Sequence, residues 1–390
     1  MRSAPVERPG LAPGAARGPG LRVTALDRYL AREILAPFAA GLLFLTQILL
    51  ATQILAQADV LLGSGVSALD VGRVALDLVP HFLGYVLPVA FLLGAVVGVG
   101  RLAEDRELVA LGAAGVSPSR LLRVPVALGA GVAVIALWLA LAVEPAALRD
   151  ARLRVNDLIR KNVTSEVRSG VFYEDLPGLT LYAERTQGGR WTHVLISDRT
   201  DPSAPLLALA QAGRIEPAGE GEEMRLVLDR GELHREELRA EEYVAARYDR
   251  ATITLGIGET LSERNRLVGS PFELGPAEIV QNARAAREPD GKRRWWTFLH
   301  RRIAGPLSIV AFGLLATPIA AWRRGGRASG YAVTLLAVVA YYAVLRFGEG
   351  LAQRGAVAPW LGANLANLAF AVVGAGLGAL VARRGAGAVR

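Results

Sequence analysis

The side chains that could do acid–base or metal chemistry are scattered along this sequence. It has no Walker A loop, no Gly-x-Ser-x-Gly motif and no cysteine. Acidic runs such as 220–223 and 236–242 are typical of solvated turns or strand faces. The four histidines lack metal-ligand spacing: His81, His193, His234 and His300. We therefore predict no catalytic residue, no metal and no cofactor on this chain, and any work it does draws on a partner or an ion gradient.

A loop at 100–119 has the pattern of a protein-docking element. We predict a short amphipathic helix at about 102–114, closed by Gly115 and Pro118. Its leucines share one side (Leu102, Leu108 and Leu111), and its acidic residues supply charge (Glu104, Asp105 and Glu107). Such a helix could dock into a groove of a soluble partner. The alternative is a solvated connector that packs on the rest of the chain.

Three arginines form a second group with binding chemistry, namely Arg301, Arg302 and Arg346. One guanidinium can donate hydrogen bonds to two phosphate oxygens at once. These side chains are therefore candidates for binding an anionic ligand, and Arg346 is the preferred one. The alternative for Arg346 is an interfacial side chain paired with Glu349.

Six apolar segments must position these groups. A bilayer core of about 30 Å needs about 20 apolar residues in a helix. Segments of this kind occupy 34–55, 74–100, 121–143, 303–321, 331–347 and 357–381. They predict an α-helical membrane protein with six transmembrane helices in a 3+3 arrangement. The patterns Gly94-x-x-x-Gly98 and Gly374-x-x-x-Gly378 predict close helix packing, within or between subunits.

Arginine in the short connections predicts the orientation of the six helices. It is abundant before the first segment, after the second, after the fourth and after the sixth, and scarce in the other short connections. By the positive-inside rule both termini are cytoplasmic and the insert at 144–302 lies outside the cytoplasm. Asp77, His81 and Arg346 lie toward helix ends, which disfavours an ion-driven mechanism and favours an external motor.

The insert reads as a β domain between two helices. Helices are expected at 145–161 and 276–286, and strands alternate between them at 179–184, 193–197, 224–229 and 243–255. We predict an antiparallel β sandwich or jelly roll. The domains are then a disordered extension at 1–24, helices one to three at 25–143, the β domain at 144–302, and helices four to six with a cytoplasmic tail at 303–390.

Composition agrees with a membrane protein. Hydrophobic residues make up 52% of the 390 residues, and the formal net charge is +8. The mean hydropathy of +0.33 excludes a disordered chain and disfavours a soluble enzyme. Because much of the arginine marks cytoplasmic helix ends, we expect no nucleic-acid partner.

Several motifs along the chain resemble the LptF/LptG family of lipopolysaccharide export permeases. The loop at 100–119 carries the strongest of them, and their order and spacing add specificity. The others are at 28–33 with 37–38, 79–80, 87–88, 91–94, 299–306, 316–318, 324–327 and 359–364.

The resemblance implies one permease subunit of an ABC transporter. Its partners would be lipopolysaccharide, a cytoplasmic ATPase dimer that uses ATP, a second six-helix permease and a periplasmic jelly-roll bridge protein. Glu107 would be the charged contact to the ATPase, and the β domain at 172–255 would pass lipid chains at its open edge. The chain departs from the family at 53–59, where basic residues that meet lipid A phosphates are absent.

Two other functions remain open at this stage. One is an ABC permease for another outer-leaflet lipid or lipoprotein. The other is a membrane assembly or sensor protein that transports nothing.

Overall fold

The computed structural model describes residues 24–56, 66–166, 169–176, 178–187, 189–199, 205–218, 223–237, 242–255, 271–321 and 326–384. Among these residues, six helices are long and apolar enough to cross a membrane, as expected. They are α1 (Ala25–Ala56), α3 (Ala68–Glu104), α5 with its continuation into α6, α9 (Pro289–Ala321), α10 (Gly326–Gln353) and α11 (Pro359–Arg384). The extension predicted at 1–24 lies outside the described residues, except for Thr24.

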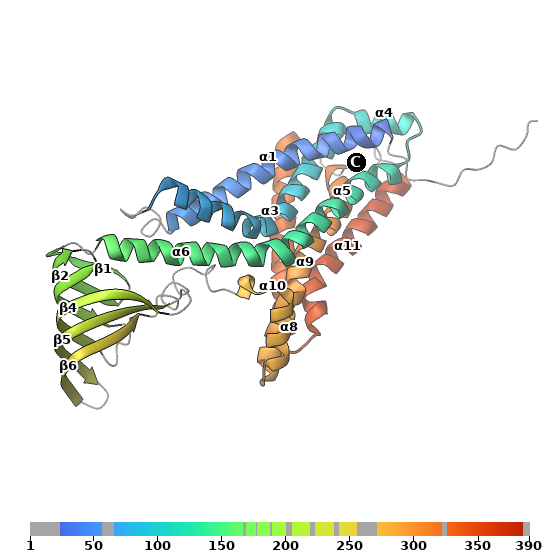
Figure 1. Ribbon diagram of the computed structural model, residues 1–390. Coiled ribbons are helices and arrows are strands. Elements are labelled where there is room, and N and C mark those ends of the chain that lie inside the picture. Colours follow the sequence, from blue (N-terminus) through green and yellow to red (C-terminus); the bar gives the residue numbers. More distant parts are fainter. Residues whose placement is uncertain are drawn as a thin grey trace, which may run out of the picture.

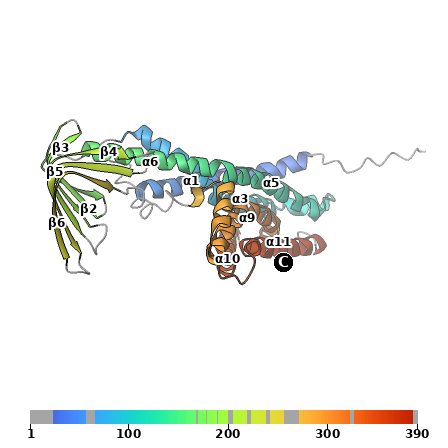
Figure 2. The ribbon, with the colours of Figure 1, turned by 60° about the horizontal axis from the view of Figure 1, so that its bottom comes forward.

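The third apolar helix leaves the bundle and reaches the β sheet. It runs through α5 (Pro118–Trp138), the π-helical turn η1 (Leu139–Val143) and α6 (Glu144–Glu166), which confirms the helix expected at 145–161. Figures 1 and 2 show α6 extending from the bundle to the sheet. The start of α1 and α4 (Glu107–Ala113) lie at the opposite end. We call the two ends of the bundle the sheet end and the α4 end.

Ion pairs hold α6 beside the other elements at the sheet end. The Nε atom of Arg154 donates to Asp77 of α3 at 2.7 Å, and Arg152 lies 3.3 Å from Glu273. Glu273 belongs to η2 (Pro271–Glu273), which is followed by α8 (Pro276–Ala285). α8 confirms the helix expected at 276–286. The chain that returns from the sheet is therefore fastened to α6 before it enters α9.

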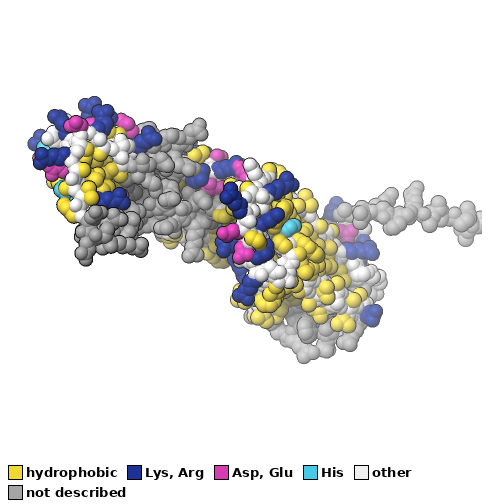
Figure 3. Space-filling model, turned by 90° about the horizontal axis from the view of Figure 1, so that it is seen from below, with side chains coloured by type: hydrophobic (Ala, Val, Ile, Leu, Met, Phe, Trp, Pro, Cys, Tyr) yellow, Lys and Arg dark blue, Asp and Glu magenta, His cyan; other side chains and the backbone are white. Residues whose placement is uncertain are grey.

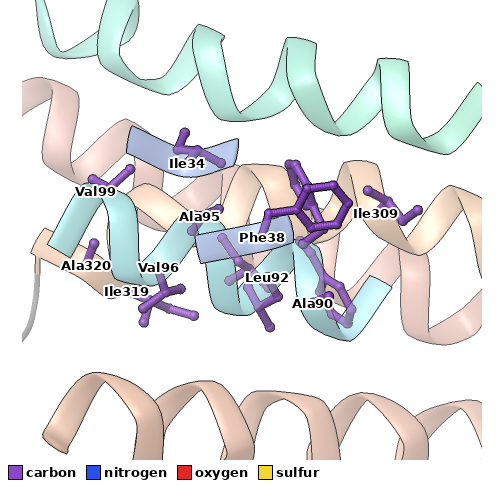
Figure 4. Packing of buried hydrophobic residues seen from close by; sticks show 14 of the residues in the cluster. Ile34, Phe38, Ala90, Leu92, Ala95, Val96, Val99, Ile309, Ile319 and Ala320 are labelled. Carbon is purple, nitrogen blue, oxygen red and sulfur yellow. The ribbon is translucent and has the colours of Figure 1, made fainter. Parts of the chain in front are cut away.

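The bundle core is closely packed where α1 crosses α3. Figure 4 shows Ile34 and Phe38 of α1 against the apolar side chains of α3. A Cβ atom on Gly98 would lie 2.4 Å from the carbonyl oxygen of Glu33, and one on Gly94 would lie 2.6 Å from the backbone of Phe38. Pro37 has no N–H to bond the Glu33 carbonyl four residues earlier, so this oxygen is free to face Gly98. The glycine pattern at 94 and 98 thus serves packing within the chain.

The pattern at 374 and 378 also faces neighbouring helices of the same chain. A Cβ atom on Gly374 would lie 2.9 Å from Leu314 of α9, and one on Gly378 would lie 3.4 Å from Leu122 of α5. Small residues here let α11 approach both helices.

The β domain is one six-stranded antiparallel sheet whose strands follow sequence order. Its strands are β1 (Phe172–Leu176), β2 (Leu179–Gln187), β3 (Arg190–Asp198), β4 (Leu206–Ala218), β5 (Glu223–Glu237) and β6 (Glu242–Leu255). The inserted antiparallel β domain is confirmed. Within the described residues the connections are those of a meander, which is simpler than the Greek-key order of a jelly roll.

A crease divides this sheet into two halves. His193 and Arg230 have left-handed backbone conformations, with φ of 47° and 53°, and ladder pairing is interrupted there and at Gln211 between them. These residues form a row across the sheet, and the alternation of buried and exposed positions along a strand changes by one residue at this row. In β3, for example, Val194 and Ile196 are buried on one side of it and Trp191 on the other. The strands bend at this row while their pairing register stays the same on both sides of it, so one meander produces the curved sheet of Figure 2.

Candidate functional site

The three arginines predicted to bind an anion come together at the sheet end of the bundle. Arg301, Arg302 and Arg346 line a cavity of about 90 Å³. Its wall is completed by Tyr85 of α3 and by Glu144, the first residue of α6. Arg301 and Arg302 come from α9 and Arg346 from α10, so packing of these helices brings the three side chains to one cavity.

The side chain of Arg302 is buried and bonded to other groups of this chain. Its side chain is 2% exposed, and it donates to the carbonyl oxygens of Leu274 at 2.6 Å and Phe272 at 2.9 Å. Glu144 lies 3.5 Å from the same guanidinium. Arg302 therefore fastens the segment after the sheet to α9. Only its Nε atom, which has no hydrogen-bond partner within the described structure, is left for another group.

Arg301 and Arg346 share the buried carboxylate of Glu349. Arg346 donates to one oxygen at 2.9 Å, and the Nε atom of Arg301 lies 3.6 Å from the other. The Arg301 guanidinium also lies over the rings of Phe272 and Phe298, 5.2 Å from each centroid. The Arg346 side chain remains 68% exposed. The pairing with Glu349 considered for Arg346 is thus present, and it leaves most of this side chain accessible.

His81 and Glu144 belong to the same group, although the sequence did not single out Glu144. The Nδ1 atom of His81 lies 2.7 Å from Oε1 of Glu144, and both side chains are buried. The π-helical turn η1 immediately precedes Glu144, and such turns reorient the side chains that follow. The sequence did carry one hint of this pair, namely an acidic residue directly after one apolar segment and a histidine near the start of another.

The charges of this cluster favour an anion. Three arginines face two carboxylates, so one net positive charge remains when His81 is neutral. Charged side chains gather beside the broad apolar surface of the bundle in Figure 3. A guanidinium at such an edge can bind a phosphate while attached apolar chains stay on the bundle.

At the α4 end, the helix predicted at 102–114 is two helices. α3 continues to Glu104, and α4 begins at Glu107. Arg106 between them has a left-handed φ of 58°, which ends α3 and redirects the chain. Gly115 closes α4 as expected: its φ is 85°, and the N–H of Val116 donates to the carbonyl oxygen of Leu111 at 3.0 Å.

The leucines of this segment pack on the bundle. Leu102 is 1% exposed and Leu108 is 4% exposed, and Leu111 packs on the same core. This corrects the prediction that they belong to a partner-docking face. The open side carries the acidic residues Glu104 and Asp105 and also Val109, which is 57% exposed and was not predicted. Val109 follows the buried Leu108 by one position, so the helical period places it on another side.

A hollow of about 880 Å³ follows the crease of the β sheet. Its lining is amphipathic. It combines apolar side chains with aromatic and charged ones, including Val194, Leu195, Leu209, Tyr248, Arg230 and Arg247. The hydroxyl of Tyr248 crosses Gly231 to donate to the carbonyl oxygen of Leu209 at 2.8 Å.

The sequence of this chain matches one family model. The model described as lipopolysaccharide export system permease LptF/LptG matches residues 28–379. The match includes all six apolar helices and the β domain. A search of curated proteins found no match.

Proposed function

This chain belongs to the LptF/LptG family of lipopolysaccharide export permeases, and we propose that it is one permease subunit of an ABC transporter. The subunit takes lipopolysaccharide from the outer leaflet of the inner membrane and passes it through its β domain to a periplasmic bridge protein. A second permease of the same family completes the membrane part. A separate cytoplasmic ATPase dimer binds ATP and supplies the energy, so this chain needs no cofactor of its own.

The observation that carries this proposal is the family match over 28–379, since it spans both helix groups and the domain between them. In the proposed orientation the α4 end and both termini face the cytoplasm, and the β domain lies in the periplasm. The arginine cluster then lies at the level of lipid headgroups. There Arg346 and Arg301 meet the phosphates of lipid A, and the acyl chains lie on the apolar helix faces.

The β domain supports the next step of the proposed route. Its hollow combines apolar and charged side chains along the crease, a combination that suits an amphipathic lipid. Lipid moves from the sheet end of the bundle along the β domain, and a free strand edge pairs with the bridge protein.

Association with an ATPase tests the coupling part of the proposal. The open side of α4 and the end of α3 carry acidic residues, and Glu107 is the proposed charged contact to the ATPase. Purification of the chain in mild detergent should recover a soluble ATPase, and Glu107→Arg should reduce its recovery. The same charge reversal at the exposed Glu288, before α9, is the control. Absence of any ATPase from the wild-type preparation would contradict the proposal.

Crosslinking tests the substrate. A photoreactive residue at Phe347, which is 64% exposed beside Arg346, should label lipopolysaccharide in membranes. Adducts with another lipid, and none with lipopolysaccharide, would identify a different cargo.

A further inference from the structure

The first family motif of the chain contacts the coupling segment directly. The hydroxyl of Tyr29 donates to Oε2 of Glu107 at 2.7 Å, although the two residues are 78 positions apart. Tyr29 belongs to the motif at 28–33 on α1, and Glu107 is the first residue of α4. Docking of an ATPase assigns a role to Glu107 but none to Tyr29.

A second contact joins the same two regions one turn further along α1. Arg101, near the end of α3, donates to Oε2 of Glu33 at 3.1 Å. Its Nε atom also lies 3.7 Å from Asp105, in the turn that precedes α4. Two successive turns near the start of α1 therefore contact the segment where α3 ends and α4 begins.

Beyond these contacts α1 is supported along one side. It packs mainly against α3, with closest approach where Glu33 and Phe38 meet Gly98 and Gly94. Beyond that crossing it exposes large apolar side chains, among them Leu43 and Phe44 at 64% and 65%. The opposite side of this part of α1 packs on the bundle core through Leu42, Leu45 and Leu49. A helix that is packed along one side only can tilt about its closest crossing, and the contact with α4 lies at its short end.

The start of α1 has a further support on α5. Arg120 donates to the hydroxyl of Thr24 at 2.7 Å and lies 3.8 Å from Asp27. This contact holds the start of α1 against the first turn of α5. The Tyr29 contact differs because its partner is on α4, the element proposed to carry the ATPase.

We propose that Tyr29 is a positioning residue that transmits displacement of α4 to α1. This inference rests on the proposed function. When the ATPase shifts α4, the hydrogen bond to Glu107 draws the short end of α1 with it, and the outer part of α1 tilts about Gly94 and Gly98. Lipid leaves or enters along the exposed apolar face of α1 that this tilt displaces.

The geometry lets Glu107 serve both partners. A carboxylate has two oxygens, each of which can accept hydrogen bonds. Tyr29 occupies Oε2, and Oε1 is directed to the ATPase in the proposed complex. Removal of the Tyr29 hydroxyl therefore separates the two roles, since it leaves the carboxylate and its charge in place.

The experiment compares ATP hydrolysis with lipid release. The full complex of this chain, its partner permease and its ATPase is reconstituted in vesicles that contain lipopolysaccharide. Recovery of the ATPase, the rate of ATP hydrolysis and the lipid released per ATP are measured for each variant. Tyr29→Phe deletes one hydroxyl, and Tyr331→Phe makes the same deletion on α10, where the side chain is 50% exposed.

Tyr29→Phe is expected to retain the ATPase and its hydrolysis within twofold while lipid released per ATP falls about 2- to 10-fold, the range expected for one net hydrogen bond. Glu107→Gln keeps an acceptor for Tyr29 and should retain lipid released per ATP, whereas Glu107→Ala should not. In the background of Glu107→Ala, adding Tyr29→Phe should have no further effect.

Two results would overturn the inference. One is lipid release per ATP in Tyr29→Phe equal to that in Tyr331→Phe. The other is loss of ATPase recovery in Tyr29→Phe in proportion to lipid release, which would make Tyr29 part of the docking surface alone. If the wild-type complex recruits no ATPase, the proposed function fails first, and the inference with it.

Discussion

The Nδ1 atom of His81 lies 2.7 Å from Oε1 of Glu144, and this buried contact joins α3 to the start of α6. Through Glu144 it also reaches Arg302, which holds the segment returning from the β sheet. Three apolar helices and the entry and exit of the β domain therefore meet at one polar group. The β domain is attached to the bundle through this group as well as through the chain.

Glu144→Ala should destabilise the protein strongly. It leaves the guanidinium of Arg302 buried without a carboxylate, and breaking a buried ion pair from one side costs about 3–5 kcal/mol. The measurement is thermal unfolding of the protein in detergent. Glu184→Ala, which removes a half-exposed carboxylate paired with the exposed His193 in the β sheet, is the control and should cost about 0–1 kcal/mol. Equal melting temperatures for the two variants would contradict a structural role for the cluster.

Gly98→Ala should disturb the crossing of α1 and α3. The added Cβ atom would lie 2.4 Å from the carbonyl oxygen of Glu33, which belongs to the backbone and cannot rotate away. We expect a loss of about 1–3 kcal/mol, as for other overpacked cores. Gly72→Ala on the same helix meets no atom within 4 Å, and should be neutral or stabilising by about 0.5–1 kcal/mol. Unfolding curves of both variants check this, and a stable Gly98→Ala protein would show that α1 can move away.

Arg346→Gln and Arg302→Gln should separate binding from folding. The Arg346 side chain is 68% exposed, so its ion pair contributes about 0–1 kcal/mol, and its loss should lower lipopolysaccharide crosslinking at Phe347 without changing the melting temperature. Arg302 is buried with three acceptors, and its loss should lower the melting temperature. Unchanged crosslinking in Arg346→Gln would remove it from the proposed site.

Gly231→Ala should disrupt the β sheet at its crease. A Cβ atom there would lie 1.8 Å from the carbonyl oxygen of Leu209 and 2.6 Å from the hydroxyl of Tyr248. β5 would have to move away from β4, so the hydrogen bond from Tyr248 should be lost. Limited proteolysis of the β domain measures this effect. The matched change Gly213→Ala meets side-chain atoms at 3.2 Å and should be milder, so equal cleavage of both variants would contradict the assignment.

Local patterns in the amino-acid sequence predicted the helices and the β domain. Runs of about 20 apolar residues predict membrane-spanning helices because few other structures satisfy the backbone in a bilayer, and all six lie where expected. Alternation predicted the β domain, and the motifs predicted the family that the match over 28–379 confirms. Each of these signals is local, so it can be read without knowing which residues meet.

Which residues lie in contact depends on tertiary packing. Leu102 and Leu108 looked like a docking face, yet packing buried them, because a helical pattern gives a face but does not name its partner. Glu144 gained its importance only when helix packing placed Arg302 beside it. The pair of Glu349 with Arg346 could be expected from their spacing, but its contact with Arg301 depends on the packing of α9 on α10. The contact between Tyr29 and Glu107 spans 78 residues, and no periodicity in either segment encodes it. Such contacts depend on how α1 crosses α3 at Gly94 and Gly98, a geometry that exists only in the folded chain.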